Sequence, residues 1–203
     1  MNKNILLVCE GPTDAHVIKE IASHHSNAVT LIAPQLDATS GTYVSHGYGK
    51  VLNWCKANTT SKIQALLAFS GRDSIFIIHL DTDIANNIYR GSDTSLNARQ
   101  RCEHRLNSEL NAILQPINTY YILPTQNIET WILASMDLSV IDNNNAQVND
   151  YETISKNNVN IILSNAGFKK EVKKYPGYGK KIASRIQKCS ALCGELQYLC
   201  TLM

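Results

Sequence analysis

The chain has 203 residues, of which 44% are hydrophobic and 18% charged, and its formal net charge is +2. These values are typical of a globular protein and exclude a largely disordered one. No apolar run approaches the roughly 18 residues of a membrane span, and residues 1–9 lack the long apolar segment of a signal peptide. We therefore expect a cytoplasmic protein that makes no membrane contact.

The first two-thirds of the chain alternates predicted strands and helices. Apolar runs predict strands at residues 4–9, 28–36, 75–80 and 118–123, and helical spacing predicts helices at residues 13–25, 49–58, 60–69, 96–114 and 127–136, with polar loops at 37–48 and 84–95. This alternation indicates parallel βαβ units, and hence an α/β fold with a mostly parallel sheet. We place the α/β domain at residues 1–140 and a C-terminal helical extension at residues 141–203.

Two short acidic signatures follow two of the predicted strands. Glu10-Gly11-Pro12-Thr13-Asp14 comes after the first strand, and Asp81-Thr82-Asp83 comes after the strand at residues 75–80. Functional groups collect at the carboxyl ends of parallel strands, so we expect both signatures at one edge of the sheet. Carboxylates gathered there repel one another unless a cation joins them, and carboxylate oxygens suit magnesium.

Each position in these signatures has a predicted role. Gly11 allows a sharp turn and lets the backbone approach a phosphate closely. Asp14 is expected either to cap the following helix or to support the metal site. If the strand direction persists, the side chains of Asp81 and Asp83 point to the same side, where the pair can hold one cation directly and a second through water.

These residues resemble a known family. ILLVCEGPTD followed by IIHLDTD is similar to the Toprim domain of topoisomerases, bacterial primases, recombination-repair proteins and nucleases of the overcoming-lysogenization-defect class. The resemblance covers roughly residues 4–135 and implies helices on both faces of the sheet. It is nearest to small stand-alone Toprim proteins, which often carry a later motif similar to NIETWILA at residues 127–134. Many Toprim sequences have a glycine soon after the second signature, where this chain has Ile84-Ala85-Asn86-Asn87.

The resemblance implies an activity and a set of metal ligands. Glu10, Asp81, Asp83 and, as a fourth acid, Glu129 would hold one or two Mg²⁺ or Mn²⁺ ions. The chain would be a nuclease that hydrolyses phosphodiester bonds in DNA or RNA. It would act as the effector of an anti-phage defence system whose ATPase or sensor is a separate chain. The alternative is a catalytically inactive Toprim-like module that binds nucleic acid or serves regulation or assembly. Formation of a homodimer is compatible with either function.

Two lysines are candidates for stabilising charge on the phosphate during cleavage. Lys50 follows Tyr48-Gly49, and Lys180 follows Tyr178-Gly179; we include Lys180 among the catalytic residues. His46 and His79 are candidates for acid–base help. Because His79 lies within an apolar run, we expect it to be a satisfied core histidine.

Basic residues are concentrated near the C-terminus. Residues 169–188 contain eight lysines and arginines and one acid. This stretch predicts contact with a nucleic-acid backbone, and a plain solvated helix face is an equally good interpretation. The residues that we assign to nucleic-acid binding are Lys50, Lys173, Lys174, Lys181 and Arg185.

Other functions fit the sequence less well. A phosphotransferase with Asp81 as nucleophile would carry its Asp-x-Asp pair on the first strand, a glycosyltransferase would need a nucleotide-sugar domain, and no GxxxxGK[ST] phosphate loop is present. The six cysteines form no CxxC pair, so we expect them to be packing thiols rather than zinc ligands.

Overall fold

The structure is a computed structural model that describes residues 2–37, 39–40, 42–43, 46–112, 117–142 and 146–203. The strands are β1 (Asn4–Val8), β2 (Ala28–Ala33), β3 (Ser74–His79) and β4 (Thr119–Ile122). The helices are α1 (Pro12–His24), α2 (Tyr48–Ala57), α3 (Thr60–Ser70), α4 (Ala85–Ile88), α5 (Ala98–Glu109), α6 (Glu129–Ser135), α7 (Lys156–Asn165), α8 (Tyr175–Ser184), α9 (Ile186–Leu192) and α10 (Gly194–Leu202). Short 3-10 turns lie at Thr82–Ile84, Tyr151–Thr153 and Val172–Lys174.

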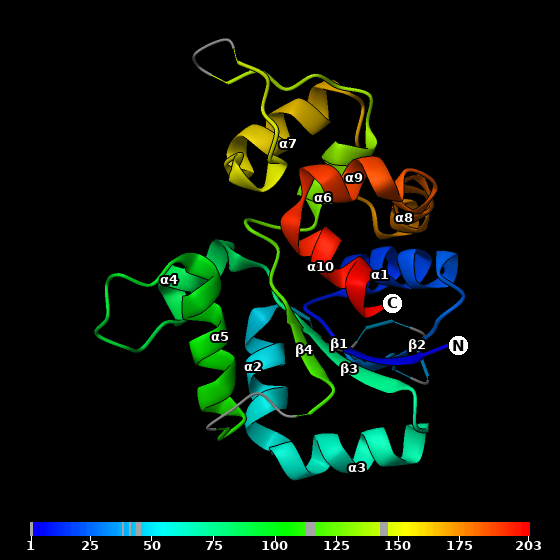
Figure 1. The fold of residues 1–203 in the computed structure, drawn as a ribbon. Helices are drawn as coiled ribbons and strands as arrows, with labels where there is room; N and C mark the ends of the chain where they lie inside the picture. The colour runs from blue at the N-terminus through cyan, green and yellow to red at the C-terminus, as the bar shows by residue number, and fades with distance from the viewer. Residues whose placement is uncertain (1, 38, 41, 44–45, 113–116, 143–145) are drawn as a thin grey trace.

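The four strands form one parallel sheet in the order β2-β1-β3-β4 (Figure 1). The two central strands, β1 and β3, are almost wholly buried, which explains why they read as continuous apolar runs. After β1 the chain continues to β2 at one edge of the sheet, and after β3 it continues to β4 at the opposite edge. The carboxyl ends of β1 and β3 therefore flank the switch point where open α/β sheets bind their ligands.

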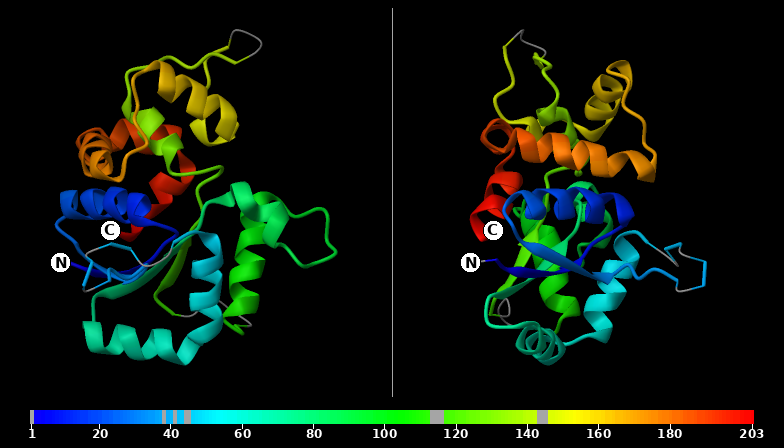
Figure 2. Two further views of the ribbon diagram at one scale, coloured as in Figure 1. Left: turned by 180° about the vertical axis from the view of Figure 1, so that it is seen from behind. Right: turned by 90° about the vertical axis from the view of Figure 1, so that its right-hand side faces the viewer.

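Helices cover both faces of the sheet, as the Figure 2 views show. Alternate residues of each strand enter different cores, because successive side chains point to opposite faces. Ile5 and Leu7 of β1 pack in a core with residues of α1, α6, α8, α9 and α10. Leu6 and Val8 pack in a second core with residues of α2, α3 and α5. The α/β class with helices on both faces is confirmed.

The C-terminal helices pack directly on the α/β part of the chain. Tyr175 and Ile182 of α8 and Leu196 of α10 are buried in the same core as α1. At Gly179, a Cβ atom would lie 2.9 Å from the Cβ of Glu20 and 3.1 Å from the Cα of Val17, so glycine lets α8 approach α1 closely. The domain boundary at residue 140 stays a prediction.

Some element boundaries differ from the predicted ones. The second strand ends at Ala33 because Pro34 has no N–H to continue the ladder. The predicted loop at residues 84–95 contains the short helix α4. Helix α5 begins at Ala98, after the N-cap Asn97, whose side chain accepts a hydrogen bond from the N–H of Gln100. No helix in the described part of the chain is long and apolar enough to cross a membrane.

Candidate functional site

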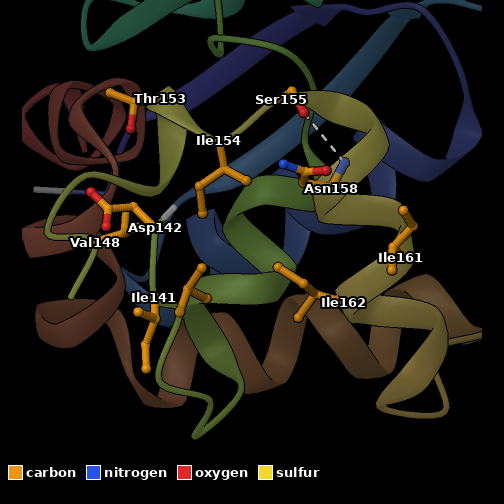
Figure 3. Close-up of a pocket in the computed structure, with 10 residues that line it drawn as sticks. Ile141, Asp142, Val148, Thr153, Ile154, Ser155, Asn158, Ile161 and Ile162 are labelled. Atoms are coloured by element: carbon orange, nitrogen blue, oxygen red, sulfur yellow. Dashed lines mark hydrogen bonds between the residues drawn. The ribbon is translucent and has the colours of Figure 1, made fainter. Parts of the chain in front are cut away.

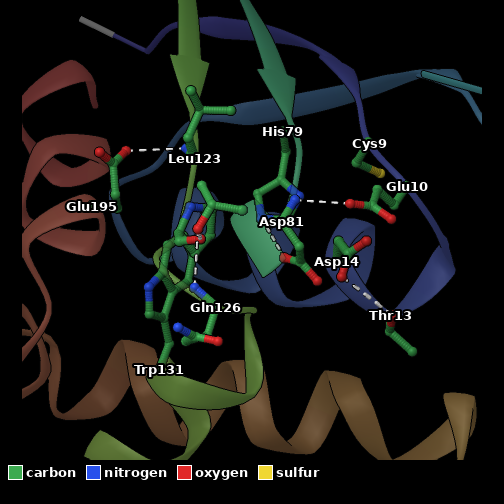
Figure 4. A network of polar contacts seen from close by, with 12 residues as sticks. Cys9, Glu10, Thr13, Asp14, His79, Asp81, Leu123, Gln126, Trp131 and Glu195 are labelled. Atoms are coloured by element: carbon green, nitrogen blue, oxygen red, sulfur yellow. Dashed lines mark hydrogen bonds and ion pairs between the residues drawn. The ribbon is translucent and has the colours of Figure 1, made fainter. Parts of the chain in front are cut away.

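The strand register brings the two acidic signatures together. Leu7 pairs with Ile77 and Val8 with Ile78, so the segments that follow β1 and β3 leave the sheet side by side. The N–H of Asp81 donates a hydrogen bond of 2.8 Å to Glu10 Oε1 across 71 positions of sequence. Figure 4 shows Glu10, Asp14 and Asp81 gathered at these strand ends.

Asp14 takes one of its two predicted roles, that at the start of α1, and its support of a metal site stays a prediction. Its Oδ2 accepts a 3.0 Å hydrogen bond from the N–H of Gly11, which completes the first turn of α1. Its side chain is also buried, with 4% of its surface exposed, next to the other acids. The residue that closes the first turn of α1 is therefore also one of the acids at this edge of the sheet.

The condition under which Asp81 and Asp83 would point to the same side, a strand that continues through them, is not met. Strand β3 ends at His79, and a 3-10 turn follows at Thr82–Ile84. The two carboxylates differ in how they are partnered. Asp83 Oδ2 accepts a hydrogen bond from Lys156 Nζ, whereas Asp81 Oδ1 is enclosed and has no hydrogen-bond partner among the described residues.

Glu129 stands at the start of α6 and is held by two groups from the C-terminal segment. Its Oε1 accepts a 2.8 Å hydrogen bond from the Tyr175 hydroxyl and lies 2.8 Å from Lys170 Nζ. The side chain of Glu129 is 5% exposed, so these partners offset much of the cost of enclosing a carboxylate. We call Glu10, Asp14, Asp81, Asp83 and Glu129 the acidic cluster.

Members of the acidic cluster perturb one another. Burial raises the pKa of Glu10 to about 7, and the charge of Asp83 contributes. Burial raises the pKa of Asp14 to about 8, with contributions from Glu10 and Glu129. The pKa of Asp81 rises well above its ordinary value through burial, then through the charges of Asp14 and Glu10. Enclosed carboxyl groups that repel one another in this way favour binding of a proton or a cation.

His79 is buried as expected but is not satisfied, which corrects half of the prediction. Its side chain is 0% exposed, and neither ring nitrogen has a hydrogen-bond partner in the described structure. Burial lowers its pKa to about 3, so the ring is neutral. Its Nε2 lies 4.0 Å from Asp81 Oδ1, too far for a hydrogen bond. Asn127, just before α6, is also buried with both amide atoms unpartnered.

The basic residues singled out in the sequence lie in different environments. Lys180 is exposed on α8 and makes no ion pair with the acidic cluster in the described part of the chain. Arg185 pairs with Asp137 at 2.6 Å and donates to the Ser135 carbonyl, so it joins α9 to the end of α6. Lys173 pairs with Glu171 at 3.2 Å. The exposed residues Lys50, Lys174 and Lys181 stay predicted contacts for nucleic acid.

The glycine of each YGK tripeptide lies within or just inside a helix rather than in a phosphate-facing turn. Gly49 is in the first turn of α2 and Gly179 is in the middle of α8.

Gly47, with φ of 101°, precedes α2, and its N–H donates to the Glu10 carbonyl. His46 lies next to Gly11, where its ring would be 3.8 Å from an added Cβ. The start of α2 is therefore placed beside the acidic cluster.

Three residues of the site were missed by sequence reasoning. Lys156 and Lys170 supply ammonium groups to the acidic cluster, and Tyr175 supplies a hydroxyl. Lys170 and Tyr175 lie in or beside the basic stretch, which gave a weak signal. Lys156 follows Ser155, which caps α7 through the N–H of Asn158, and no motif marks it as a partner of an acid.

The acidic cluster was tested as a magnesium site. No three histidine, cysteine, aspartate or glutamate side chains in the described ranges already stand at the spacing of metal ligands. The cluster nevertheless offers the oxygen donors that Mg²⁺ and Mn²⁺ prefer, and the enclosed Asp81 Oδ1 lacks a partner. Glu10, Asp81, Asp83 and Glu129 therefore suit such an ion in the chemistry of their oxygens, although they do not stand at ligand spacing and Lys156 and Lys170 occupy two of them.

A half-open pocket lies elsewhere in the molecule. It measures about 490 Å³ and is lined by apolar side chains such as Ile154 and Ile162 and by polar ones such as Asp142 and Asn158 (Figure 3). No member of the acidic cluster lines it. All six cysteines are free thiols, and all but Cys200 are buried.

Comparisons with protein-family models, with curated proteins and with solved structures gave no significant match.

Proposed function

We propose that this protein is a divalent-metal-dependent nuclease that hydrolyses phosphodiester bonds in DNA or RNA. The observation that carries the proposal is the acidic cluster at the switch point of the sheet. Carboxylates from the ends of β1 and β3 and from the starts of α1 and α6 meet there, and one enclosed oxygen has no partner. The likeness of the two signatures to the Toprim pattern supports the same proposal.

In this proposal four of the acids bind the metal and the fifth supports them. Glu10, Asp81, Asp83 and Glu129 would hold one or two Mg²⁺ or Mn²⁺ ions, and Asp14 would support them by fixing the turn at Gly11. A bound ion would supply an activated water and would stabilise the departing oxygen. Lys156 and Lys170, rather than Lys180, have their ammonium groups at the acidic cluster and would neutralise a phosphate placed there.

The proposal is tested by cleavage assays on supercoiled plasmid, single-stranded DNA and RNA. Each substrate is incubated with Mg²⁺, with Mn²⁺ and with EDTA. We expect cleavage with a metal and none with EDTA. Glu10→Gln and Asp81→Asn should each lower the rate about 100-fold or more, as loss of metal-site groups does.

Strand β3 supplies a matched control for Asp81. Asp73 is an exposed acid beside the opposite end of the same strand, so Asp73→Asn removes one charge without touching the acidic cluster. Its cleavage rate should equal that of the wild type. Cleavage that persists in EDTA, or that survives both Glu10→Gln and Asp81→Asn, would contradict the proposal.

One observation favours a second candidate, a non-catalytic module that binds nucleic acid. Two of the four predicted metal ligands already have ammonium partners, so part of the acidic cluster is neutralised without a metal. This candidate predicts binding of DNA or RNA that weakens steeply with salt, no cleavage with either metal, and equal binding in EDTA.

A further inference from the structure

The ammonium group of Lys156 lies among the acids, in the place where a metal cation would be expected. Lys156 begins α7, and its Nζ donates to Asp83 Oδ2. Burial alone would lower the pKa of Lys156, but the bond to Asp83 and the charges of Asp81 and Glu129 together raise it. Its charge also lowers the pKa of Glu10. One ammonium group therefore acts on four members of the acidic cluster.

Lys170 makes a similar contact with another acid of the cluster. Its Nζ lies 2.8 Å from Glu129 Oε1, the oxygen that also accepts from Tyr175. Both lysines belong to the C-terminal segment, and each occupies an oxygen of a predicted metal ligand. Among the described residues, no ammonium group pairs with Glu10, Asp14 or Asp81, and burial raises the pKa of each of these three acids.

Each pair joins a partly exposed ammonium group to an enclosed carboxylate. The side chain of Lys156 is 42% exposed and that of Lys170 is 61% exposed, whereas their partners Asp83 and Glu129 are 16% and 5% exposed. The ammonium groups can therefore move into water, but the carboxylates then need another cation in their place. A divalent ion carries twice the charge of an ammonium group and can be shared by several carboxylates at once.

We propose that Lys156 and Lys170 are resident counterions that a divalent cation displaces from Asp83 and Glu129, so that the freed ammonium groups face the phosphate of a nucleic acid. This inference rests on the metal site of the proposed function and adds an exchange of ions to it. Each lysine stays tethered beside the site after displacement, and a new anion is then its best partner. Metal and nucleic acid should therefore each tighten the binding of the other, and by the same factor.

The first test measures metal binding by calorimetric titration with Mn²⁺, with no nucleic acid present. Lys156→Met removes one competitor, so it should tighten Mn²⁺ binding about two- to fivefold, the factor that corresponds to a weak ion pair. Lys174→Met is the matched control. Lys174 is an exposed lysine whose replacement changes the net charge equally, and it should change Mn²⁺ affinity less than Lys156→Met does. Equal effects of the two variants would overturn the inference.

The second test needs no variant and therefore does not depend on a substituted protein folding. Lysines of the wild type are acetylated at low reagent concentration, and each site is quantified by mass spectrometry with Mn²⁺ or with EDTA. Displacement should make Lys156 and Lys170 react about two- to fivefold faster with Mn²⁺, while Lys180 serves as an unchanged control. Unchanged labelling of Lys156 and Lys170 in the presence of bound Mn²⁺ would overturn the inference.

Failure of this inference and failure of the metal site give different results. Mn²⁺ that binds without altering Lys156 labelling leaves the metal site standing and rejects the exchange. Mn²⁺ that binds neither wild type nor Lys156→Met removes the metal site, and the exchange with it. Mn²⁺ that binds only to Lys156→Met supports the exchange, because Lys156 then prevents Mn²⁺ from reaching Asp83 in the wild type.

Discussion

Two groups of enclosed carboxylates in the described part of the chain differ in how completely they are partnered. In the first group, Glu152 accepts from the Trp131 indole at 3.0 Å and from the Glu195 N–H at 3.1 Å. Glu195 accepts from Arg99 Nε and from the Leu123 N–H, so all four oxygens of this pair are satisfied. The second group is the acidic cluster, where Asp81 Oδ1 has no partner and neighbouring acids raise one another's pKa values.

The comparison separates a structural use of buried acids from a functional one. Glu152 and Glu195 tie α6, α10 and the end of β4 together, and every hydrogen bond they make is internal to the fold. Folding alone gives no reason to enclose an acid whose oxygen is left unsatisfied, since each such atom costs free energy. An unsatisfied carboxylate oxygen at a strand switch point is therefore better explained by a ligand than by stability.

The largest expected effect comes from breaking the satisfied pair. Glu195→Ala leaves Arg99 without its enclosed partner and the Leu123 N–H without an acceptor. We expect the free energy of unfolding to fall by about 3 kcal/mol, measured by urea denaturation. Glu103→Gln is the control: Glu103 pairs with the same Arg99 at 3.0 Å on the exposed side. Its loss should cost about 0.5 kcal/mol or less.

An equal small loss in Glu195→Ala and Glu103→Gln would mean that the enclosed pair does not hold the helices. The distinction drawn between the two carboxylate groups would then disappear.

The next effect is the pH dependence of stability without metal. Glu10 and Asp14 have pKa values of about 7 and about 8 in the folded protein and about 4 when unfolded. The folded state therefore binds protons more tightly between these values. Their contribution to stability is fully present below pH of about 4 and is lost as the pH rises through about 7 to 8. In EDTA, unfolding free energies measured from pH 6.5 to 8 should fall by about 2 kcal/mol.

Variants assign this pH dependence to the acidic cluster. Glu10→Gln and Asp14→Asn should each flatten the fall, and the Asn side chain can still accept from the Gly11 N–H. Asp73→Asn should keep the wild-type slope, because Asp73 is exposed beside the opposite end of β3. Stability that rises with pH over this range would show that the acids are held by partners, as Glu195 is.

Features of the site that depend on neighbouring residues in the sequence were predictable, and those that depend on distant segments were not. Glu10 and Asp81 each follow an apolar strand directly, and parallel strands end at one edge, so their meeting was predictable. The direction of Asp83 was not, because a 3-10 turn follows the strand. Lys156 lies 73 positions from its partner and has no motif, so only the packing of α7 reveals it.

The same reasoning explains the two YGK tripeptides. Both have the same letters, but their surroundings differ. Gly179 lies where α8 crosses α1 closely, whereas a Cβ on Gly49 would meet nothing within 4 Å. A tripeptide carries no information about the neighbouring helix, so neither role could be predicted from the sequence.

The smallest effect is the sharpest test of the comparison. Asp81→Asn keeps the shape of the side chain but removes a charge that has one unpartnered oxygen and acidic neighbours. At pH 8 in EDTA we expect it to raise the free energy of unfolding by about 1 kcal/mol, because it removes repulsion and a desolvation cost. Asp73→Asn should change stability by less than about 0.5 kcal/mol under the same conditions. A loss of 1 kcal/mol or more in Asp81→Asn would place this carboxylate with Glu195 as a structural group. A gain would mean that the folded chain keeps Asp81 at the expense of its own stability, which is what a residue retained to bind a cation should do.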